Sequence, residues 1–333
     1  MSIDKFSFPT TVYFGPGARK QVGEHLRAQG VKRPLIVTDQ GVAALPLLTE
    51  FKSTLNALAT GVFAGVFGNP IASQVMAGAA AYQAHGADAV IGLGGGAALD
   101  VAKVVGLMAS HAGNVIEYAW DHPQARAIEK ALPYFVALPT TSGTGSEVGR
   151  SSVISEDESH IKRIIFSPKI LAKAVFADPE LTLGLPAKIT AATGMDALTH
   201  NVESYLSPAY HPMCDGIALE GVRIAARALP IAVREPQNLQ ARADMMMASM
   251  MGAVAFQKDL GATHSCAHAL GTVMDMHHGL ANGIMIDHVM RFNRDAALGK
   301  FRVLAQCVGV EESTDAASAD AFIAWLGRLK QEI

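Results

Sequence analysis

The stretch Asp88-Ala-Val-Ile-Gly-Leu-Gly94-Gly95-Gly96-Ala-Ala-Leu-Asp100 has the order that decides the fold. A short apolar run ends at Leu93, three glycines follow, and a helical pattern then continues to Ala109. We interpret this as a buried strand, a glycine turn and a helix N-terminus. Such a turn exposes backbone N–H groups and lacks Cβ atoms, so a pyrophosphate can approach closely. A tight strand-to-helix turn that binds nothing is the simpler alternative.

Strand and helix patterns alternate on both sides of this stretch. The apolar runs are separated by helical segments, which is typical of a parallel sheet covered on both faces. The other predicted strands are 6–14, as an edge strand or hairpin, and 34–39, 61–67, 134–138, 152–155, 163–166 and 174–177. The other predicted helical segments are 18–29, the residues after 39 up to 59, and 71–85.

The pattern changes after the Asp178-Pro179 dipeptide and is helical almost throughout from Pro186 onward. We therefore predict two domains, an α/β domain at residues 1–182 and an all-helical domain at residues 183–333. The methionine-rich segment at 245–251 is interpreted as core filling, because methionine adapts to irregular gaps.

The helical half contains two pairs of candidate metal ligands. His264 and His268 are four residues apart, as are Asp196 and His200, so a helix would place each pair on one face. His278 follows ten residues after His268. Imidazole and carboxylate groups commonly bind divalent transition metals. The alternatives are hydrogen-bonded core histidines and an Asp196 that only complements a helix dipole. Both pairs in one chain favour a metal site.

A loop of hydroxyls and glycines follows another predicted strand, as Pro139-Thr-Thr-Ser-Gly-Thr-Gly-Ser-Glu147. Its hydroxyl groups suit contacts to a phosphate or a ribose. Asp39 ends an earlier predicted strand, and ligands of such sheets bind at the carboxyl ends of the strands. We therefore expect Asp39 to meet a ribose hydroxyl. A solvated loop and a surface aspartate are the alternatives.

Composition excludes several classes of function. The chain has 333 residues, of which 50% are hydrophobic and 17% charged, with a net charge of -3. This charge gives no reason to expect nucleic acid or an acidic membrane as a partner. The three cysteines form no CxxC pair and no even disulfide set, so we expect a cytoplasmic protein. No signal segment or membrane span is expected.

Taken together, these stretches resemble the iron-containing (group III) alcohol dehydrogenase family. The resemblance implies an α/β dinucleotide-binding domain followed by an all-α metal-binding domain, in a dehydroquinate synthase-like architecture. The shared stretches are GGGAALD at 94–100, PTTSGTGSE at 139–147, DPELT at 178–182, GMDALTHNVE at 194–203, HSCAHALG at 264–271 and HHG at 277–279.

The resemblance also implies roles for individual residues. The implied metal ligands are Asp196, His200, His264 and His278. His268, the expected catalytic residue, matches a family histidine near the metal and the nicotinamide that is usually not a ligand, and it would either relay the proton or orient the nicotinamide. Cofactor contacts are implied for Asp39, Gly95, Gly96, Asp100, Thr140, Thr141, Thr144 and Lys162. The metal is expected to be Fe(II), with Zn(II) as the alternative. The charge of Asp39 would repel a 2′-phosphate, so NAD is expected rather than NADP.

The implied reaction is reversible hydride transfer between NAD and a small primary alcohol, or an aldehyde in reverse. The alternatives are a maleylacetate reductase-like enzyme, a dehydroquinate synthase-like lyase and a catalytically silent binding protein. We also expect a homo-oligomer, a dimer. The sequence departs from the family at Ala97, where a serine is usual. The family also continues through further C-terminal helices, so we expect a helical domain that is short or truncated at Ile333.

Overall fold

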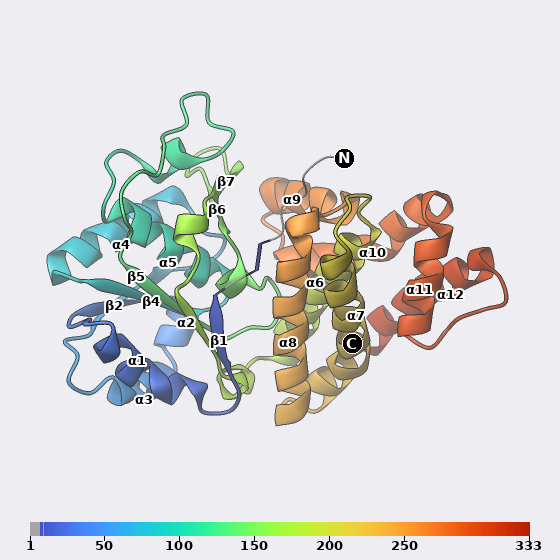
Figure 1. Ribbon diagram of the computed structural model, residues 1–333, viewed down its shortest axis with the longest axis horizontal. Coiled ribbons are helices and arrows are strands. Elements are labelled where there is room, and N and C mark those ends of the chain that lie inside the picture. The colour runs from blue at the N-terminus through green and yellow to red at the C-terminus, as the bar shows by residue number, and fades with distance from the viewer. Residues whose placement is uncertain (1–6, 9) are drawn as a thin grey trace. The chain divides into compact units, whose positions relative to one another are not determined.

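The computed structural model describes residues 7–8 and 10–333, which form two compact units. An α/β unit contains residues 10–140 and 146–181, and a helical unit contains residues 182–333 with the short segment 141–145. In Figure 1 the blue-to-green part of the chain contains the strands, and the yellow-to-red part is built of helices. Phe6 and Pro9, part of the strand expected at 6–14, lie outside the described residues.

In the described residues, six parallel strands form the centre of the α/β unit. They are β1 (Thr11–Phe14), β2 (Pro34–Asp39), β3 (Gly61–Val66), β4 (Ala89–Gly94), β5 (Tyr134–Pro139) and β8 (Ala174–Ala177). Their order across the sheet is β1-β8-β5-β4-β2-β3, and every neighbouring pair is parallel. β1 is thus an edge strand and does not form a hairpin.

The helices of this unit follow the strands in the chain. They are α1 (Val22–Ala28), α2 (Gln40–Ala43), α3 (Pro46–Thr54), α4 (Ala72–His85) and α5 (Gly96–Met108). Short 3₁₀ helices lie at Ala18–Gln21, Val115–Tyr118, Ser146–Val148, Pro168–Ile170 and Pro179–Thr182.

Helices cover both faces of the sheet (Figure 1), as alternate residues of β4 show. Ile91 and Leu93 belong to one buried cluster with Leu26 of α1 and Phe51 of α3. Gly92 faces the other way, because a Cβ on it would come within about 3 Å of Leu99 and Ala102 on α5. The expected parallel sheet, buried on both sides, is confirmed, and a helical region follows it in the chain.

Two predicted helical segments differ from the structure. The segment after residue 39 is divided at Pro46, because a residue before proline avoids the helical conformation, and Leu45 is extended with φ −92° and ψ 151°. The segment predicted from Ala18 begins as a 3₁₀ turn. There the N–H groups of Gly17 and Arg19 donate to the buried Asp178 carboxylate, at 3.1 and 3.2 Å.

A separate two-stranded antiparallel sheet completes the α/β unit. It consists of β6 (Ser151–Ser155) and β7 (Lys162–Phe166), in which Ser155 is paired with Lys162. The Ser155 N–H donates to the carbonyl of Pro70 at 2.8 Å, which ties this sheet to the loop after β3. Both strands were predicted from the sequence and are confirmed.

The described part of the helical unit contains seven α-helices. They are α6 (Ala187–Leu206), α7 (Pro212–Arg234), α8 (Leu239–Ala255), α9 (Ala262–Met274), α10 (His278–Asn293), α11 (Leu298–Cys307) and α12 (Asp315–Glu332). Two 3₁₀ helices lie at Phe256–Lys258 and Arg294–Ala296. Within the described residues, no helix is both long and apolar enough to cross a bilayer.

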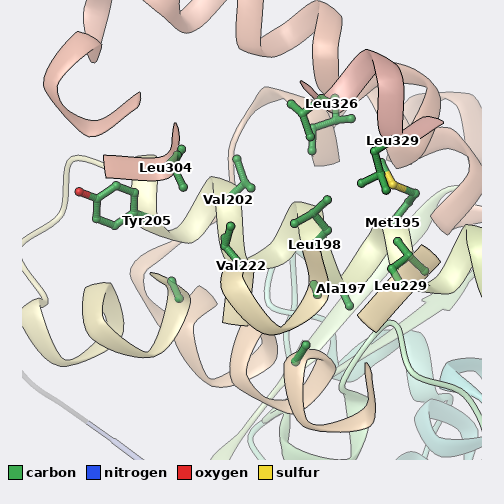
Figure 2. Packing of buried hydrophobic residues seen from close by; sticks show 14 of the residues in the cluster. Met195, Ala197, Leu198, Val202, Tyr205, Val222, Leu229, Leu304, Leu326 and Leu329 are labelled. Atoms are coloured by element: carbon green, nitrogen blue, oxygen red, sulfur yellow. The ribbon is translucent and has the colours of Figure 1, made fainter. Parts of the chain in front are cut away.

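The core of this unit is organised around α6. Figure 2 shows Leu198 and Val202 of α6 among Val222 of α7, Leu304 of α11 and Leu326 of α12. This burial of apolar side chains on several sides fixes the position of α6. Met245, Met246 and Met250 of α8 are buried as well, which confirms that the methionine-rich segment fills the core.

Candidate functional site

Four side chains from three helices of the helical unit converge on one small volume. Asp196 and His200 lie on α6, His264 on α9, and His278 is the first residue of α10. One ligand atom of each lies within 4.8 Å of the other three. The Asp196 Oδ1 atom is 4.0, 3.6 and 3.5 Å from the Nε2 atoms of His200, His264 and His278, respectively. The structure thus brings together the four residues expected to be metal ligands.

Close helix packing places these side chains. A Cβ on Gly279, in the first turn of α10, would lie 2.3 Å from the carbonyl oxygen of Ala192 on α6. A Cβ on Gly252 of α8 would lie 2.8 Å from the Cβ of His200. Glycine at both positions therefore lets α8 and α10 approach α6 closely enough to complete the cluster.

The electrostatics of the cluster favour a bound cation. Burial opposes ionisation of Asp196, but His200, His278 and His264 together hold its pKa well below its ordinary value. Burial lowers the pKa of His200 to about 4, so this ring is neutral near pH 7. Burial also disfavours a charge on His264, yet Asp196 and Glu203 outweigh it and raise its pKa to about 9. The buried carboxylates of Asp196 and Glu203 thus favour the protonated, positively charged form of His264.

The donor set fits a divalent transition metal. Three imidazole nitrogens and one carboxylate oxygen are ligands that such ions accept. Among the described residues the buried Nε2 atom of His264 has no hydrogen-bond partner, and its distance from Asp196 is too long for a hydrogen bond. A buried nitrogen in this state is costly unless another group satisfies it. A metal ion would satisfy it and would replace the proton that the carboxylates favour.

Two aromatic side chains border the cluster. The half-buried His268 lies one helical turn beyond His264, and its ring centroid is 5.3 Å from that of His278. Phe256 follows α8, with its ring 5.2 Å from the ring of His200. His268 is therefore beside the four candidate ligands without being a member of their set.

The carboxyl ends of β2, β4 and β5 bring the candidate nucleotide-binding residues to one edge of the sheet. The Thr140 N–H donates to the Gly94 carbonyl at 3.0 Å. One oxygen of Asp39 caps α2 by accepting from the Val42 N–H at 2.8 Å. Its other oxygen would lie 2.8 Å from a Cβ on Gly94, where φ is +151°. Asp39 and the glycine turn are thus neighbours, as the expected contact with a dinucleotide requires.

The N-terminus of α5 faces this edge. Gly95 is its N-cap residue and Gly96 its first residue, and no side chain caps the helix there. Its first N–H groups are therefore available to an anion, which the helix dipole also favours. This arrangement suits a pyrophosphate.

Asp100, also expected to contact the cofactor, is bound to other protein groups. Its Oδ1 accepts from the Ser146 hydroxyl at 2.5 Å and lies 3.5 Å from the Lys103 ammonium. Its Oδ2 accepts from the Val153 N–H at 2.9 Å. In this structure Asp100 therefore fastens α5 to the end of the hydroxyl-rich loop and to β6.

The remaining three expected cofactor contacts lie in other segments. Thr141 and Thr144 belong to segment 141–145 of the helical unit, in which Gly143 packs closely against Thr193. Lys162 begins β7 opposite Ser155, next to the loop after β3.

Sequence reasoning passes over two buried polar residues that contact the cluster. Glu203 accepts a hydrogen bond from the Nδ1 atom of His264 at 2.7 Å. Asn282 donates to the Oδ1 atom of Asp196 at 2.7 Å. The helical period could have found both, because Glu203 is seven residues after Asp196 and Asn282 is four after His278.

Comparison with known families assigns both halves of the chain to one family. Residues 9–179 match the family model described as iron-containing alcohol dehydrogenase. Residues 190–333 match the model for the C-terminal part of the Fe-containing alcohol dehydrogenase family. Together these two matches cover most of the chain.

Individual proteins of known sequence or structure are also similar. A 4-hydroxybutyrate dehydrogenase of Cupriavidus necator is 41% identical over 293 residues, which are 86% of this chain and 76% of the relative. A 1,3-propanediol dehydrogenase of Klebsiella pneumoniae is 38% identical and aligns with 100% of this chain and 87% of its own length. A crystal structure of 1,3-propanediol oxidoreductase superposes with a TM-score of 0.94 at 36% identity, covering 99% of this chain and 87% of that chain.

Proposed function

Because the chain belongs to the iron-containing alcohol dehydrogenase family and is an NAD-dependent alcohol dehydrogenase, we propose that it oxidises a small primary alcohol with the help of one divalent metal ion. The observation that supports this most is the cluster of Asp196, His200, His264 and His278. The relatives named for 4-hydroxybutyrate and 1,3-propanediol support a short alcohol as substrate, and the corresponding aldehyde in reverse. Fe(II) is the proposed metal and Zn(II) the alternative.

Each unit has its own task in this proposal. Residues 1–182 hold NAD, with the α5 N–H groups on the pyrophosphate and the Asp39 carboxylate accepting from a ribose hydroxyl. Residues 183–333 hold the ion, which when bound supplies Lewis acidity toward the oxygen of the alcohol or aldehyde. His268, beside the ligand set, passes the hydroxyl proton of the substrate to solvent.

The proposed setting is a cytoplasmic homodimer. Cys214, Cys266 and Cys307 are all free thiols, which suits a reducing compartment. Light scattering on the purified chain would test the dimer.

The ligand cluster and the accumulation of NADH separate this proposal from its two enzymatic alternatives. A maleylacetate reductase-like enzyme would have no use for the complete set of four ligands. A dehydroquinate synthase-like lyase would need the metal but would regenerate NAD within each turnover. A lyase therefore accumulates no NADH, whereas a dehydrogenase forms one NADH for each alcohol oxidised.

We expect turnover to depend on the metal. Protein stripped with a chelator should form no NADH from 1,3-propanediol, 4-hydroxybutyrate or short primary alcohols. Anaerobic addition of Fe(II), or of Zn(II), should restore NADH formation with an equal amount of aldehyde. The measurement is NADH absorbance together with aldehyde analysis. Full activity of the stripped protein would contradict the proposed metal, and loss of substrate without NADH would favour the lyase.

Asp39→Asn should weaken the preference for NAD over NADP. The substitution removes the negative charge near the ribose, but its oxygen can still accept from the Val42 N–H and cap α2. Two charges about 4 Å apart repel by about 4 kcal/mol at an effective dielectric constant of about 20, and about 1.4 kcal/mol is a factor of ten. We therefore expect the NADP-to-NAD ratio of kcat/KM to rise at least about tenfold.

The matched control for this charge removal is Asp88→Asn. Asp88 accepts from the Lys32 and Arg33 N–H groups and precedes β4, so it lies at the opposite edge of the sheet. In Asp88→Asn the NADP-to-NAD ratio of kcat/KM should stay at the wild-type value. An unchanged ratio in Asp39→Asn would mean that Asp39 does not select the cofactor.

A further inference from the structure

Glu203 is a fully enclosed carboxylate that joins two of the ligand-bearing helices. It lies in the last turns of α6, seven residues after Asp196, and its side chain is 1% exposed. Its Oε2 atom is 2.7 Å from the Nδ1 atom of His264 on α9, and the two residues are 61 positions apart in the sequence. The proposed reaction assigns no role to this carboxylate.

The same carboxylate is also the cap of α9. Gly261, the N-cap residue of α9, provides no side-chain cap. The backbone N–H groups of Gly261 and Thr263 donate to Glu203 at 3.0 and 2.7 Å, and that of His264 at 3.3 Å. An anion is stabilised at such a helix N-terminus. The start of α9 is thereby held in a fixed position relative to the helix that bears Asp196 and His200.

These contacts fix the tautomer of His264. The three backbone groups are all donors, so Glu203 acts as an acceptor, and Nδ1 must provide the hydrogen of the fourth contact. A neutral His264 then has its free lone pair on Nε2, the buried atom that points toward Asp196 and has no hydrogen-bond partner within residues 7–8 and 10–333. Carboxylates that hold the second ring nitrogen of a ligand histidine in this way orient the ring and make it a stronger ligand.

We propose that Glu203 is a positioning residue for the metal centre. Its carboxylate holds His264 in the Nδ1–H tautomer, with Nε2 directed at the ion. This inference rests on the proposed function, in which the four clustered residues bind a divalent metal. Gly261 supports it sterically, because a Cβ there would lie 2.7 Å from the Oε1 atom of Glu203. The carboxylate therefore fits a site with no room for a larger residue at the cap.

The test is Glu203→Gln in the full chain, with cobalt(II) and zinc(II) as probes. Glutamine keeps the size of the side chain, but it replaces one acceptor oxygen by a donor group that faces either Thr263 or His264. Loss of such a partner typically weakens metal binding by about 10- to 100-fold. We expect that loss in chelator competition, a changed cobalt(II) absorption spectrum, and an altered ¹⁵N signal of the His264 Nδ1–H group in the zinc-loaded protein.

Asn201→Ala is the matched control, because it distinguishes positioning from general damage to α6. Asn201 is fully buried on the same helix and donates to the carbonyls of Ala197 and Ala248 at 2.8 and 2.9 Å. Its loss should lower the Tm without changing metal affinity or the tautomer of His264. Wild-type affinity and spectra in Glu203→Gln would overturn the inference. If wild-type protein bound neither metal, the proposed function would fail first, so the two failures are distinguishable.

Discussion

His264→Ala should abolish alcohol oxidation and metal retention together. The substitution removes one of the three imidazoles around Asp196 and leaves the Glu203 carboxylate without its histidine partner. Lewis-acid assistance by a metal contributes several kcal/mol, and each 1.36 kcal/mol corresponds to a factor of ten in rate. We therefore expect kcat to fall by at least about a thousandfold, measured as NADH formation at saturating alcohol. Elemental analysis of the purified variant should show metal well below one equivalent.

His288→Ala is the control for loss of a histidine outside the cluster. Its side chain is 61% exposed on α10, and its Nε2 atom lies 4.0 Å from the Asp287 carboxylate. Surface pairs of this kind contribute little, so metal content and kcat should stay close to wild type. If His264→Ala and His288→Ala were equally active, the cluster of four residues would not be the catalytic centre.

The strands that the sequence predicts most closely are those buried on both faces. β2 was expected at 34–39 and has the same bounds, and β4 was expected at 88–93 and is observed at Ala89–Gly94. A strand covered by helices on both sides must be apolar at nearly every position, so a short apolar run is a clear signal. The helical segment after residue 39 is divided by a single proline, Pro46. The segment from Ala18 begins as a 3₁₀ turn because of contacts with the distant Asp178. Helical periodicity predicts neither effect.

Strand order could not be predicted from local patterns. β1 pairs with β8, so that Thr11 lies opposite Ala174, and no local feature of either strand selects this partner. The position of β4 between β2 and β5 is what brings Asp39, Gly94 and Thr140 to one edge. The separate motifs could therefore be predicted, whereas their adjacency is a property of the folded sheet.

In the candidate site, too, local spacing could be predicted from the sequence, whereas contacts between separate helices could not. Asp196 and His200 share a helix face by their spacing alone, so the sequence was enough to pair them. The contact from Glu203 to His264 exists only because α9 packs against α6, and it joins residues 61 positions apart. The spacing of Glu203 from Asp196 places both residues on one face of a helix, but only the packing of α9 shows that the Glu203 carboxylate contacts a candidate ligand.

Lys103→Met should destabilise the α/β unit strongly. The Lys103 side chain on α5 has no exposed surface, and its ammonium donates to the Ser146 hydroxyl and the Ser151 carbonyl, both at 2.7 Å. Burial lowers the pKa of Lys103, although Asp100 and Glu147 oppose this shift. Removing one partner of a buried charge pair typically costs about 3–5 kcal/mol. Asp100 keeps its contacts with Ser146 and Val153, so we expect a loss of about 3 kcal/mol in the free energy of unfolding, measured in urea.

Two further variants distinguish the effect of breaking the charge pair on stability from the effect of losing any lysine. Lys130→Met removes an exposed lysine of the same unit and should change the free energy of unfolding by less than about 0.5 kcal/mol. The double variant Asp100→Asn/Lys103→Met removes both members of the Asp100–Lys103 pair, so its loss should be smaller than the sum of the two single losses. Because α5 begins at the glycine turn, Lys103→Met should also raise the KM for NAD. Equal unfolding curves for Lys103→Met and Lys130→Met would show that the buried ammonium does not stabilise the packing of α5 against the end of the hydroxyl-rich loop and β6.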